Sequence, residues 1–343
     1  MGDKVVCFGE IMMRLATPGF QRLVQADSFE VTYGGGEANV SVSMANFGAE
    51  SFFVSCVPDN PLGQSAINHL RRFGVNTDFV NRSGSRLGIY FLETGASQRA
   101  STVVYDRAFS AVAEAKPDSY DWDEVFRGAS WFHFTGITPA LGDKAASAVL
   151  NGCKKAKEAG VRVSCDLNYR KKLWSPEKAR EVMSELMPYV DVVVANEEDA
   201  EKTFGIKSLS SDIGKGELDL AGYREVAQEL AGRFNLQSVA ITLRESLSAS
   251  ENGWSGLLYD SADSGFSVSE RYLIKIVDRV GGGDSFAAGL IYGMLQGWQR
   301  QKVIDFAAAA SCLKHTIPGD FNMVSVDEVE RLCKGDASGR VQR

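Results

Sequence analysis

The sequence predicts an α/β fold in which a mostly parallel sheet is covered by helices on both faces. Apolar runs of strand length alternate with longer stretches of helical period along most of the chain, which is the pattern of such a sheet. Several helical stretches end in glycine, as helix C-termini often do. The 343 residues suffice for one large domain, or for one domain with a small appendage.

The predicted strands are short apolar runs, and the predicted helices fill the stretches between them. The strands are Val5–Met12, Ser51–Val57, Trp131–Ile137, Val161–Leu167, Val190–Ala195, Ser238–Leu243, Leu257–Asp260 and Gly265–Val277. The helices are Ala38–Phe47, Gly63–Phe73, Lys144–Ala159, Pro176–Met187, Tyr223–Phe234, Asp284–Gln296, Val303–Lys314 and Val326–Cys333. The polar stretch at residues 208–222 predicts a surface insertion.

Two segments interrupt this alternation. Arg22–Tyr33, and the pair Gly88–Thr94 and Ser101–Arg107, have the alternating polarity of short antiparallel strands. They predict a small second sheet, from about residues 14–35 and 88–108, that serves as a lid and excludes water from a pocket. An edge extension without such a role is the alternative.

Composition narrows the class of protein. The net charge of -7 comes from 44 acidic and 37 basic residues without long runs, which argues against nucleic acid or a membrane surface as a partner. Six scattered cysteines without a C-x-x-C pair predict free thiols in a reducing compartment. The three histidines lack metal-ligand spacing, so the sequence offers few residues that could build a zinc site or a Ser-His-Asp centre.

The start of the chain is charged rather than apolar. It carries Asp3, Lys4, Glu10 and Arg14, and no apolar run approaches membrane-spanning length. The expected location is therefore the cytoplasm.

The most informative segment is Asp278–Asp284, which reads D-R-V-G-G-G-D and leads into a predicted helix. Gly281, Gly282 and Gly283 let backbone N–H groups converge on one point, and the helix adds the positive end of its dipole. Asp284 stands in the first turn, where a carboxylate can take the proton from an attacking hydroxyl. The segment predicts an anion hole with a general base, as phosphoryl transfer needs. A glycine-rich turn with Asp284 as an ordinary N-cap is the alternative.

A second glycine-rich motif, G-G-G-E-A-N-V, runs from Gly34 to Val40 and also precedes a predicted helix. It exposes backbone at Gly34 and Gly35 and places the polar side chain of Asn39 at the helix start, and these three residues are expected to bind the substrate. A dinucleotide-binding loop should instead follow the first strand, where Cys7–Glu10 lacks G-x-G-x-x-G. A dehydrogenase is therefore not expected.

Together the two motifs resemble the two signatures of the ribokinase (PfkB-type) family of sugar kinases, over the chain from Val5 to about Leu332. The commonest family form of the second signature is D-T-x-G-A-G-D, from which this chain departs at Arg279 and Gly282. The resemblance implies a ribokinase-like three-layer α/β/α sheet with a small β lid. It also implies one kinase domain over residues 1–333, a tail at 334–343 and a homo-oligomer.

The same resemblance implies the cofactors, which are ATP and Mg²⁺, with a monovalent cation as a further candidate. Asn196 and Glu198 match an N-x-x-E element near the metal-bound phosphates, although an acid-rich helix N-terminus explains them equally well. Thr242 matches a Thr-x-Gly turn at the nucleotide, with Arg244 in place of the glycine. Ala308–Lys314 is similar to the family's helix beside the adenine ring, or is simply a core helix.

The expected acceptor is a sugar acid. Tyr90, Tyr105 and the segment Asp166–Arg170 resemble family members that phosphorylate 2-keto-3-deoxygluconate. A carboxylate needs cations or hydroxyl donors, so Arg107 and Arg170 are predicted to converge on it, and Tyr90 and Tyr105 to supply phenolic donors. Solvated arginines, or arginines on ATP phosphate, are the alternative.

Two rival functions remain beside the sugar-acid kinase. One is a neutral-hexose kinase such as fructokinase, and the other is a catalytically silent sugar-acid-binding regulator on the same fold. The intact Asp284 and glycines argue against the silent protein. The stretch His315–Asn322 is expected near the active site, because it resembles the sugar-acid kinases there.

Overall fold

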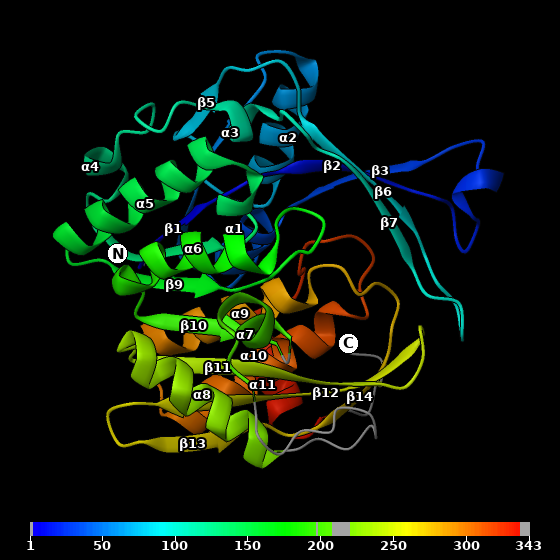
Figure 1. The fold of residues 1–343 in the computed structure, drawn as a ribbon. Coiled ribbons are helices and arrows are strands. Elements are labelled where there is room, and N and C mark those ends of the chain that lie inside the picture. The colour runs from blue at the N-terminus through cyan, green and yellow to red at the C-terminus, as the bar shows by residue number, and fades with distance from the viewer. Residues whose placement is uncertain (1–2, 197, 208–219, 337–343) are drawn as a thin grey trace.

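A computed structural model describes residues 3–196, 198–207 and 220–336 of the chain. Residues 208–219 of the predicted insertion and residues 337–343 of the predicted tail lie outside this part, as does Glu197. Within it, the strands form one ten-stranded sheet and one four-stranded sheet (Figure 1). The predicted α/β class is confirmed.

The large sheet runs in the order β13-β12-β11-β10-β9-β8-β1-β4-β5, and β14 also pairs with β12. Its strands are β1 (Lys4–Phe8), β4 (Glu50–Val57), β5 (Val80–Arg82), β8 (Ala129–Thr135), β9 (Arg162–Asp166), β10 (Val192–Ala195), β11 (Ser238–Ser246), β12 (Glu251–Asp260), β13 (Gly265–Val268) and β14 (Tyr272–Lys275). Neighbouring strands are parallel from β5 to β11. The pairs that β12 makes are antiparallel. In the centre, Val5 lies opposite Ser51 and Trp131.

Helices cover both faces of this sheet and create two hydrophobic cores. One core includes buried residues of α1 (Gly36–Asn46), α2 (Pro61–Arg72), α9 (Gly282–Leu295), α10 (Arg300–Lys314) and α11 (Val326–Cys333). The other includes α3 (Ala111–Glu114), α4 (Trp122–Val125), α5 (Asp143–Glu158), α6 (Pro176–Leu186), α7 (Asp199–Phe204) and α8 (Leu220–Phe234). Short 3₁₀ turns are Leu23–Gln25, Pro139–Leu141 and Met187–Tyr189.

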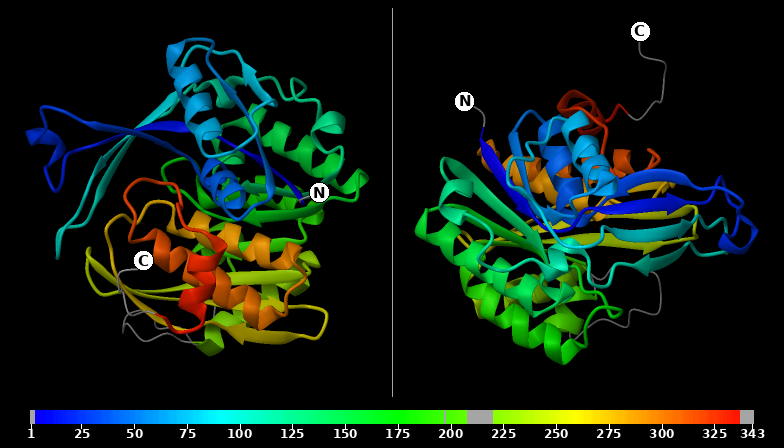
Figure 2. Two further views of the ribbon diagram at one scale, coloured as in Figure 1. Left: turned by 180° about the vertical axis from the view of Figure 1, so that it is seen from behind. Right: turned by 90° about the horizontal axis from the view of Figure 1, so that it is seen from above.

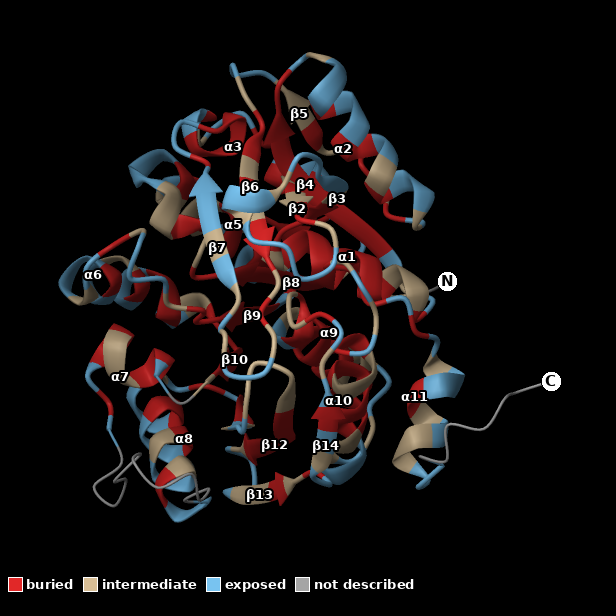
Figure 3. Ribbon diagram, turned by 90° about the vertical axis from the view of Figure 1, so that its right-hand side faces the viewer, coloured by how far each residue is buried: buried red, intermediate tan, exposed pale blue. Residues whose placement is uncertain are grey.

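The alternation of side chains along a strand explains why one strand serves both cores. In β1, Val5 and Cys7 belong to one core, whereas Val6 and Phe8 belong to the other. Figure 3 shows the central strands as buried between the helical layers. The predicted three-layer arrangement is confirmed.

The small sheet has the order β3-β2-β6-β7, with β2 (Met12–Ala16), β3 (Glu30–Gly34), β6 (Gly88–Glu93) and β7 (Thr102–Asp106). It projects from one side of the body, as the views from behind and from above show (Figure 2). The strands β6 and β7 are antiparallel, as expected. The residues Met12, Ala16, Tyr90 and Leu92 form a small core under it.

Several strand predictions were wrong in extent. The predicted strand Leu257–Asp260 is the end of the longer β12, and the predicted strand segment Arg22–Tyr33 contains the 3₁₀ turn Leu23–Gln25 and becomes a strand only at Glu30. The predicted strand Val5–Met12 is broken after Phe8, and its end begins β2 of the small sheet. At the break, a Cβ on Gly9 would overlap the Glu37 carboxylate, a contact that the continuous apolar run does not reveal. The predicted strand Gly265–Val277 is two strands, β13 and β14.

All six cysteines are free, as predicted. No helix in the described ranges is long and apolar enough to cross a membrane.

Candidate active site

A cavity of about 340 Å³ lies between the small sheet and the edge of the large sheet where β9, β10 and β11 carry Asp166, Ala195 and Thr242. Ligands of open α/β sheets bind at this carboxyl edge. Most of the predicted site residues line the cavity: Asn39, Tyr90, Tyr105, Arg107, Arg170, Asn196, Thr242, Gly281, Gly283 and Asp284. His315 and Asp320 line it too, so part of the stretch His315–Asn322 lies where it was expected.

Four predicted residues are not among those that line the cavity: Gly34, Gly35, Gly282 and Glu198. The three glycines face protein atoms instead. A Cβ on Gly34 would overlap the Asp320 carboxylate, one on Gly35 the Glu10 carbonyl oxygen, and one on Gly282 the His315 ring. These glycines permit close packing behind the site.

The glycine loop is built around two glycines with different tasks. Gly281 has φ of +83° at the start of α9, and a Cβ there would overlap the Asp320 carbonyl oxygen. Glycine adopts this left-handed conformation without strain. Gly283 is exposed, and a Cβ on it would meet no atom within 4 Å. The first turn of α9 therefore presents open backbone and a helix N-terminus to the cavity, which suits an anion.

The carboxyl group of Asp284 lies in that first turn and faces the cavity. Burial of this carboxyl group raises the pKa of Asp284 to about 7, and the negative charges of Asp320 and Glu37 raise it further. The Nδ2 group of Asn39 donates a hydrogen bond of 2.6 Å to Asp284 Oδ2, which opposes the rise in pKa. A carboxylate with this pKa is suited to act as a general base near neutral pH.

Arg107 forms a buried ion pair with Glu10, and both side chains line the cavity. Glu10 Oε1 and Arg107 Nε have no hydrogen-bond partner among the described residues. The Arg107 guanidinium also lies 5.6 Å from the centre of the Tyr105 ring. Arg107 was predicted to bind the substrate carboxylate together with Arg170, but its charge is neutralised by Glu10, and polar atoms of both side chains are left without a hydrogen bond in the described part of the chain.

Arg170 is different, because its side chain is exposed and, within the described part of the chain, donates only a long 3.4 Å hydrogen bond to the Tyr169 carbonyl oxygen. Its positive charge also lowers the pKa of both Asp166 and Asp284, which places it within electrostatic reach of the base. Of the two predicted arginines, Arg170 is the one whose charge is available to a ligand.

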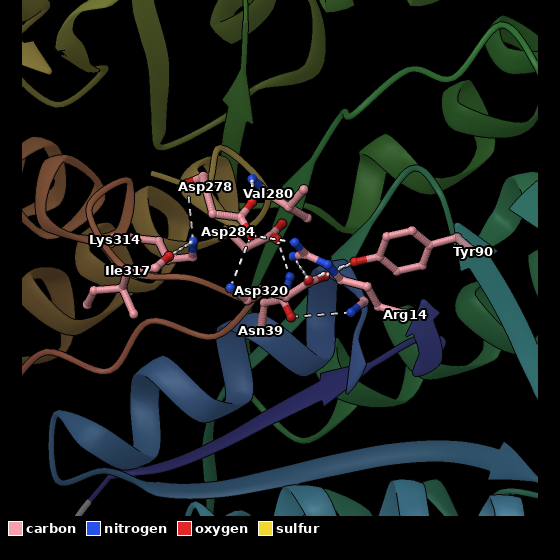
Figure 4. A network of polar contacts seen from close by, with 11 residues as sticks. Arg14, Asn39, Tyr90, Asp278, Val280, Asp284, Lys314, Ile317 and Asp320 are labelled. Carbon is pink, nitrogen blue, oxygen red and sulfur yellow. Dashed lines mark hydrogen bonds and ion pairs between the residues drawn. The ribbon is translucent and has the colours of Figure 1, made fainter. Parts of the chain in front are cut away.

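Tyr90 is committed to a buried network (Figure 4). Its hydroxyl donates to the Asp320 carboxylate, at 2.7 and 2.6 Å from the two oxygens. Arg14 donates to Asp320 at 2.7 Å and also bonds to Asp278. The Tyr90 hydroxyl was expected to donate to the sugar, but it donates to Asp320 instead. Together with Arg14 it connects strands β6 and β2 of the small sheet to the segment around the glycine loop. Asp320 belongs to the stretch His315–Asn322, which was expected near the active site without a role for each residue.

The far end of the cavity is lined by Asn196, Asp199 and Thr242. Asp199 is buried and accepts backbone N–H groups of Asn196 at 3.0 Å and Tyr169 at 2.9 Å, whereas Glu198 is exposed. Counted from Asn196, the acidic position of an N-x-x-E element is Asp199. The residue that was predicted, Glu198, precedes it by one position and does not line the cavity.

Two buried carboxylates, those of Asp166 and Asp199, line this end of the cavity and suit a divalent metal. The described residues contain no group of three or more His, Cys, Asp or Glu side chains that could hold a metal ion. Mg²⁺ in kinases is bound through one or two carboxylates together with phosphates and water, and the buried Asp166 and Asp199 meet that need. Burial and the neighbouring Asp199 raise the pKa of Asp166, so a cation there would be favourable.

The helix beside the proposed adenine ring belongs to the core. Ala308, Ala309 and Ala310 of α10 are fully buried, and none of them lines the cavity. The core interpretation of Ala308–Lys314 is the one that the structure supports.

Comparison with known proteins places this geometry in context. Residues 3–325 match a family model described as pfkB family carbohydrate kinase. The chain is 34% identical over 339 residues to 2-dehydro-3-deoxygalactonokinase of Haloferax volcanii, covering 99% of each protein. It is 27% identical over 333 residues to the probable fructokinase-2 of Arabidopsis thaliana, covering 94% of this chain and 93% of that protein.

Among solved structures, the chain is similar to the crystal structure of 2-dehydro-3-deoxygluconokinase from Thermotoga maritima. The TM-score is 0.93 and the identity 53%, and the match covers 97% of this chain and 100% of that one.

Proposed function

The chain belongs to the pfkB family of carbohydrate kinases, and from this we propose that it phosphorylates a sugar acid with ATP. The proposed substrate is 2-dehydro-3-deoxy-D-gluconate (2-keto-3-deoxygluconate) and the product its 6-phosphate. The observation that carries the proposal is the pairing, in one cavity, of a base poised near neutral pH with an available arginine, Asp284 with Arg170.

Transfer begins when the sugar hydroxyl attacks the γ-phosphorus of ATP. Asp284 accepts the hydroxyl proton, and Asn39 holds the carboxylate in place through its hydrogen bond. The bond from the γ-phosphorus to the bridging oxygen breaks, and ADP leaves. The open backbone at Gly283 and the start of α9 stabilise negative charge on the phosphoryl oxygens. Mg²⁺, held near Asp166 and Asp199, would neutralise phosphate charge.

The acid group of the substrate is assigned to Arg170, with Tyr105 as a hydroxyl donor. The Glu10–Arg107 pair offers both an acceptor and a donor, as a sugar hydroxyl requires. Two relatives of the chain are named as kinases of deoxy sugar acids, which supports this assignment over a neutral hexose. The intact Asp284 favours an enzyme over a silent binding protein.

The small sheet is proposed to close over the substrate as a lid within a kinase domain of residues 1–333. Its outer face also supports the expected homo-oligomer, because one row of paired residues across the four strands is apolar. The row is Val31, Leu15, Phe91 and Val104. Val31 and Val104 are exposed by 55% and 46%. An exposed apolar row of this kind favours packing against a second copy of the chain.

The proposal is tested by following ADP release with purified protein, ATP and Mg²⁺, using sugar acids and neutral hexoses as acceptors. Formation of ADP together with a product phosphorylated at the sixth carbon, identified by NMR, is expected for 2-dehydro-3-deoxygluconate. Turnover of hexoses alone would favour the fructokinase alternative, and binding of the acid without ADP release would favour the silent protein.

A further inference from the structure

Lys314, the last residue of α10, has no exposed surface at all. Its side chain runs behind the glycine loop, where a Cβ on Gly281 would lie 3.2 Å from Lys314 Cε. The ammonium group donates to the backbone carbonyl oxygens of Ile317 at 3.1 Å and Asp278 at 3.4 Å (Figure 4). A lysine thus lies directly behind the anion hole and outside the residues that line the cavity.

A fully buried ammonium is costly unless opposite charges and hydrogen bonds compensate for the lost water. Burial lowers the pKa of Lys314, and the charges of Asp278 and Asp320 oppose this effect. Among the described residues, no carboxylate forms an ion pair with the ammonium within 4.0 Å. Its direct partners are peptide oxygens instead, which are the ligands that a small metal cation would also take.

The neighbouring carboxylates are already occupied. Arg14 bonds to both Asp278 and Asp320, and Asp278 also accepts the N–H groups of Val280 and Gly319, each at 3.0 Å. One arginine faces two carboxylates here, so the ammonium supplies a second positive group beside them, and the two carboxylates favour its charged form. Its field then acts on the loop between Asp278 and Gly281, to which it is hydrogen-bonded.

We propose that Lys314 is the built-in cation of the anion hole. Its ammonium holds the loop through the Asp278 carbonyl group and places a fixed positive charge behind the backbone that receives the transferred phosphoryl group. Lys314 is thus a positioning residue for phosphoryl transfer, and it replaces the monovalent cation that the family resemblance suggested as a further cofactor. The proposal rests on phosphoryl transfer but not on the identity of the sugar.

The first test uses the unmodified enzyme and its best acceptor, whichever sugar that is. Initial rates are compared in potassium, sodium and tetramethylammonium chloride at equal ionic strength. Equal rates are expected, because the ammonium already fills the place of a cation. Activation by potassium of several-fold over tetramethylammonium would overturn the proposal.

The second test uses Lys314→Met, which keeps the length of the side chain and removes the charge. We expect kcat to fall by roughly 10- to 100-fold, somewhat less than for loss of a direct oxyanion donor, with KM for the sugar little changed. The control is Lys302→Met on the same helix, where Lys302 is half-exposed and pairs with Glu330 at 3.0 Å. The control should leave kcat unchanged.

The third test distinguishes an electrostatic role from a merely structural one. Lys314→Ala leaves room beside the Asp278 and Ile317 carbonyl oxygens, so potassium or ammonium ions should restore part of the lost kcat, and tetramethylammonium should not. A loss of activity that tracks a lower Tm and responds to no cation would contradict the proposal. If neither variant folds, the salt comparison on the unmodified enzyme still decides.

Discussion

Asn39 donates a 2.6 Å hydrogen bond from Nδ2 to Oδ2 of Asp284, and so joins the first turn of α1 to the first turn of α9. Its own Oδ1 accepts the N–H group of Gly35 at 3.2 Å, which fixes the amide orientation. The two glycine motifs, 245 residues apart at these positions, therefore meet in one hydrogen bond. Asn39 acts on the base, and the sequence had assigned it to the substrate.

Replacing Asp284 by Asn should remove the general base and keep the shape of the side chain. We expect kcat to fall by roughly 10² to 10⁴, while ATP affinity, measured by calorimetry, changes little. Turnover within a few-fold of the unmodified enzyme would remove Asp284 as the base.

The pH dependence of kcat/KM should follow the Asp284 carboxyl group. This group must be deprotonated to accept a proton, so activity should be low in acid and rise through a pH of about 7. The Asn39 hydrogen bond favours the charged form, so Asn39→Ala should raise the pKa and move the rise to higher pH. An unchanged profile in Asn39→Ala would show that another group controls it.

Gly283→Val should slow the reaction severely without unfolding the protein. A side chain at this position enters open space in the cavity, where it blocks the backbone from the phosphoryl group. Gly282→Val is the comparison, because its side chain would meet the buried His315 ring and should lower Tm as well. Normal rates in a well-folded Gly283→Val protein would mean that this glycine only turns the chain.

Arg170→Met should weaken use of the acid substrate and leave ATP binding unaffected. A charge-assisted hydrogen bond contributes about 1.5–3 kcal/mol, equivalent to roughly 10- to 150-fold in kcat/KM. The exposed Arg72 supplies a matched control as Arg72→Met, which should change nothing. A comparable rise in KM for ATP in Arg170→Met would instead place Arg170 on the nucleotide.

Arg107→Met is expected to behave differently from Arg170→Met, because it leaves the buried Glu10 carboxylate without its partner. It should lower Tm as well as activity, and Glu10→Gln in the same protein should recover part of the stability. If both arginine substitutions lowered kcat/KM for the acid substrate equally and neither lowered Tm, the proposed difference between the two environments would be contradicted.

The motif-bearing parts of the site could be predicted from the sequence because their chemistry lies in consecutive residues. Gly281, Gly283 and Asp284 are placed by one turn and the helix that follows, which local sequence encodes. The sequence could not distinguish Gly283, which is open to the cavity, from Gly282, which is packed against His315. That difference depends on a contact with a distant segment.

The missed contacts are all long-range. Arg107 and Glu10 are 97 residues apart, and Tyr90 and Asp320 are 230 apart, so neither pairing follows from spacing or composition. A tyrosine or arginine in a site motif looks like a ligand donor until its structural partner is known. The buried ammonium of Lys314 was hidden in the same way, because a lysine that ends a helix is usually solvated.

The proposal that this carbohydrate kinase acts on a sugar acid is tested most directly by the ratio of kcat/KM for the acid to kcat/KM for a neutral hexose. The unmodified enzyme is assayed with ATP and Mg²⁺ on 2-dehydro-3-deoxygluconate and on fructose, and kcat/KM is measured for each. The exposed charge of Arg170, in the same cavity as the Asp284 base, predicts a clear preference for the acid. An enzyme that phosphorylates fructose more efficiently than the acid would contradict the assignment, whatever the arginine variants show.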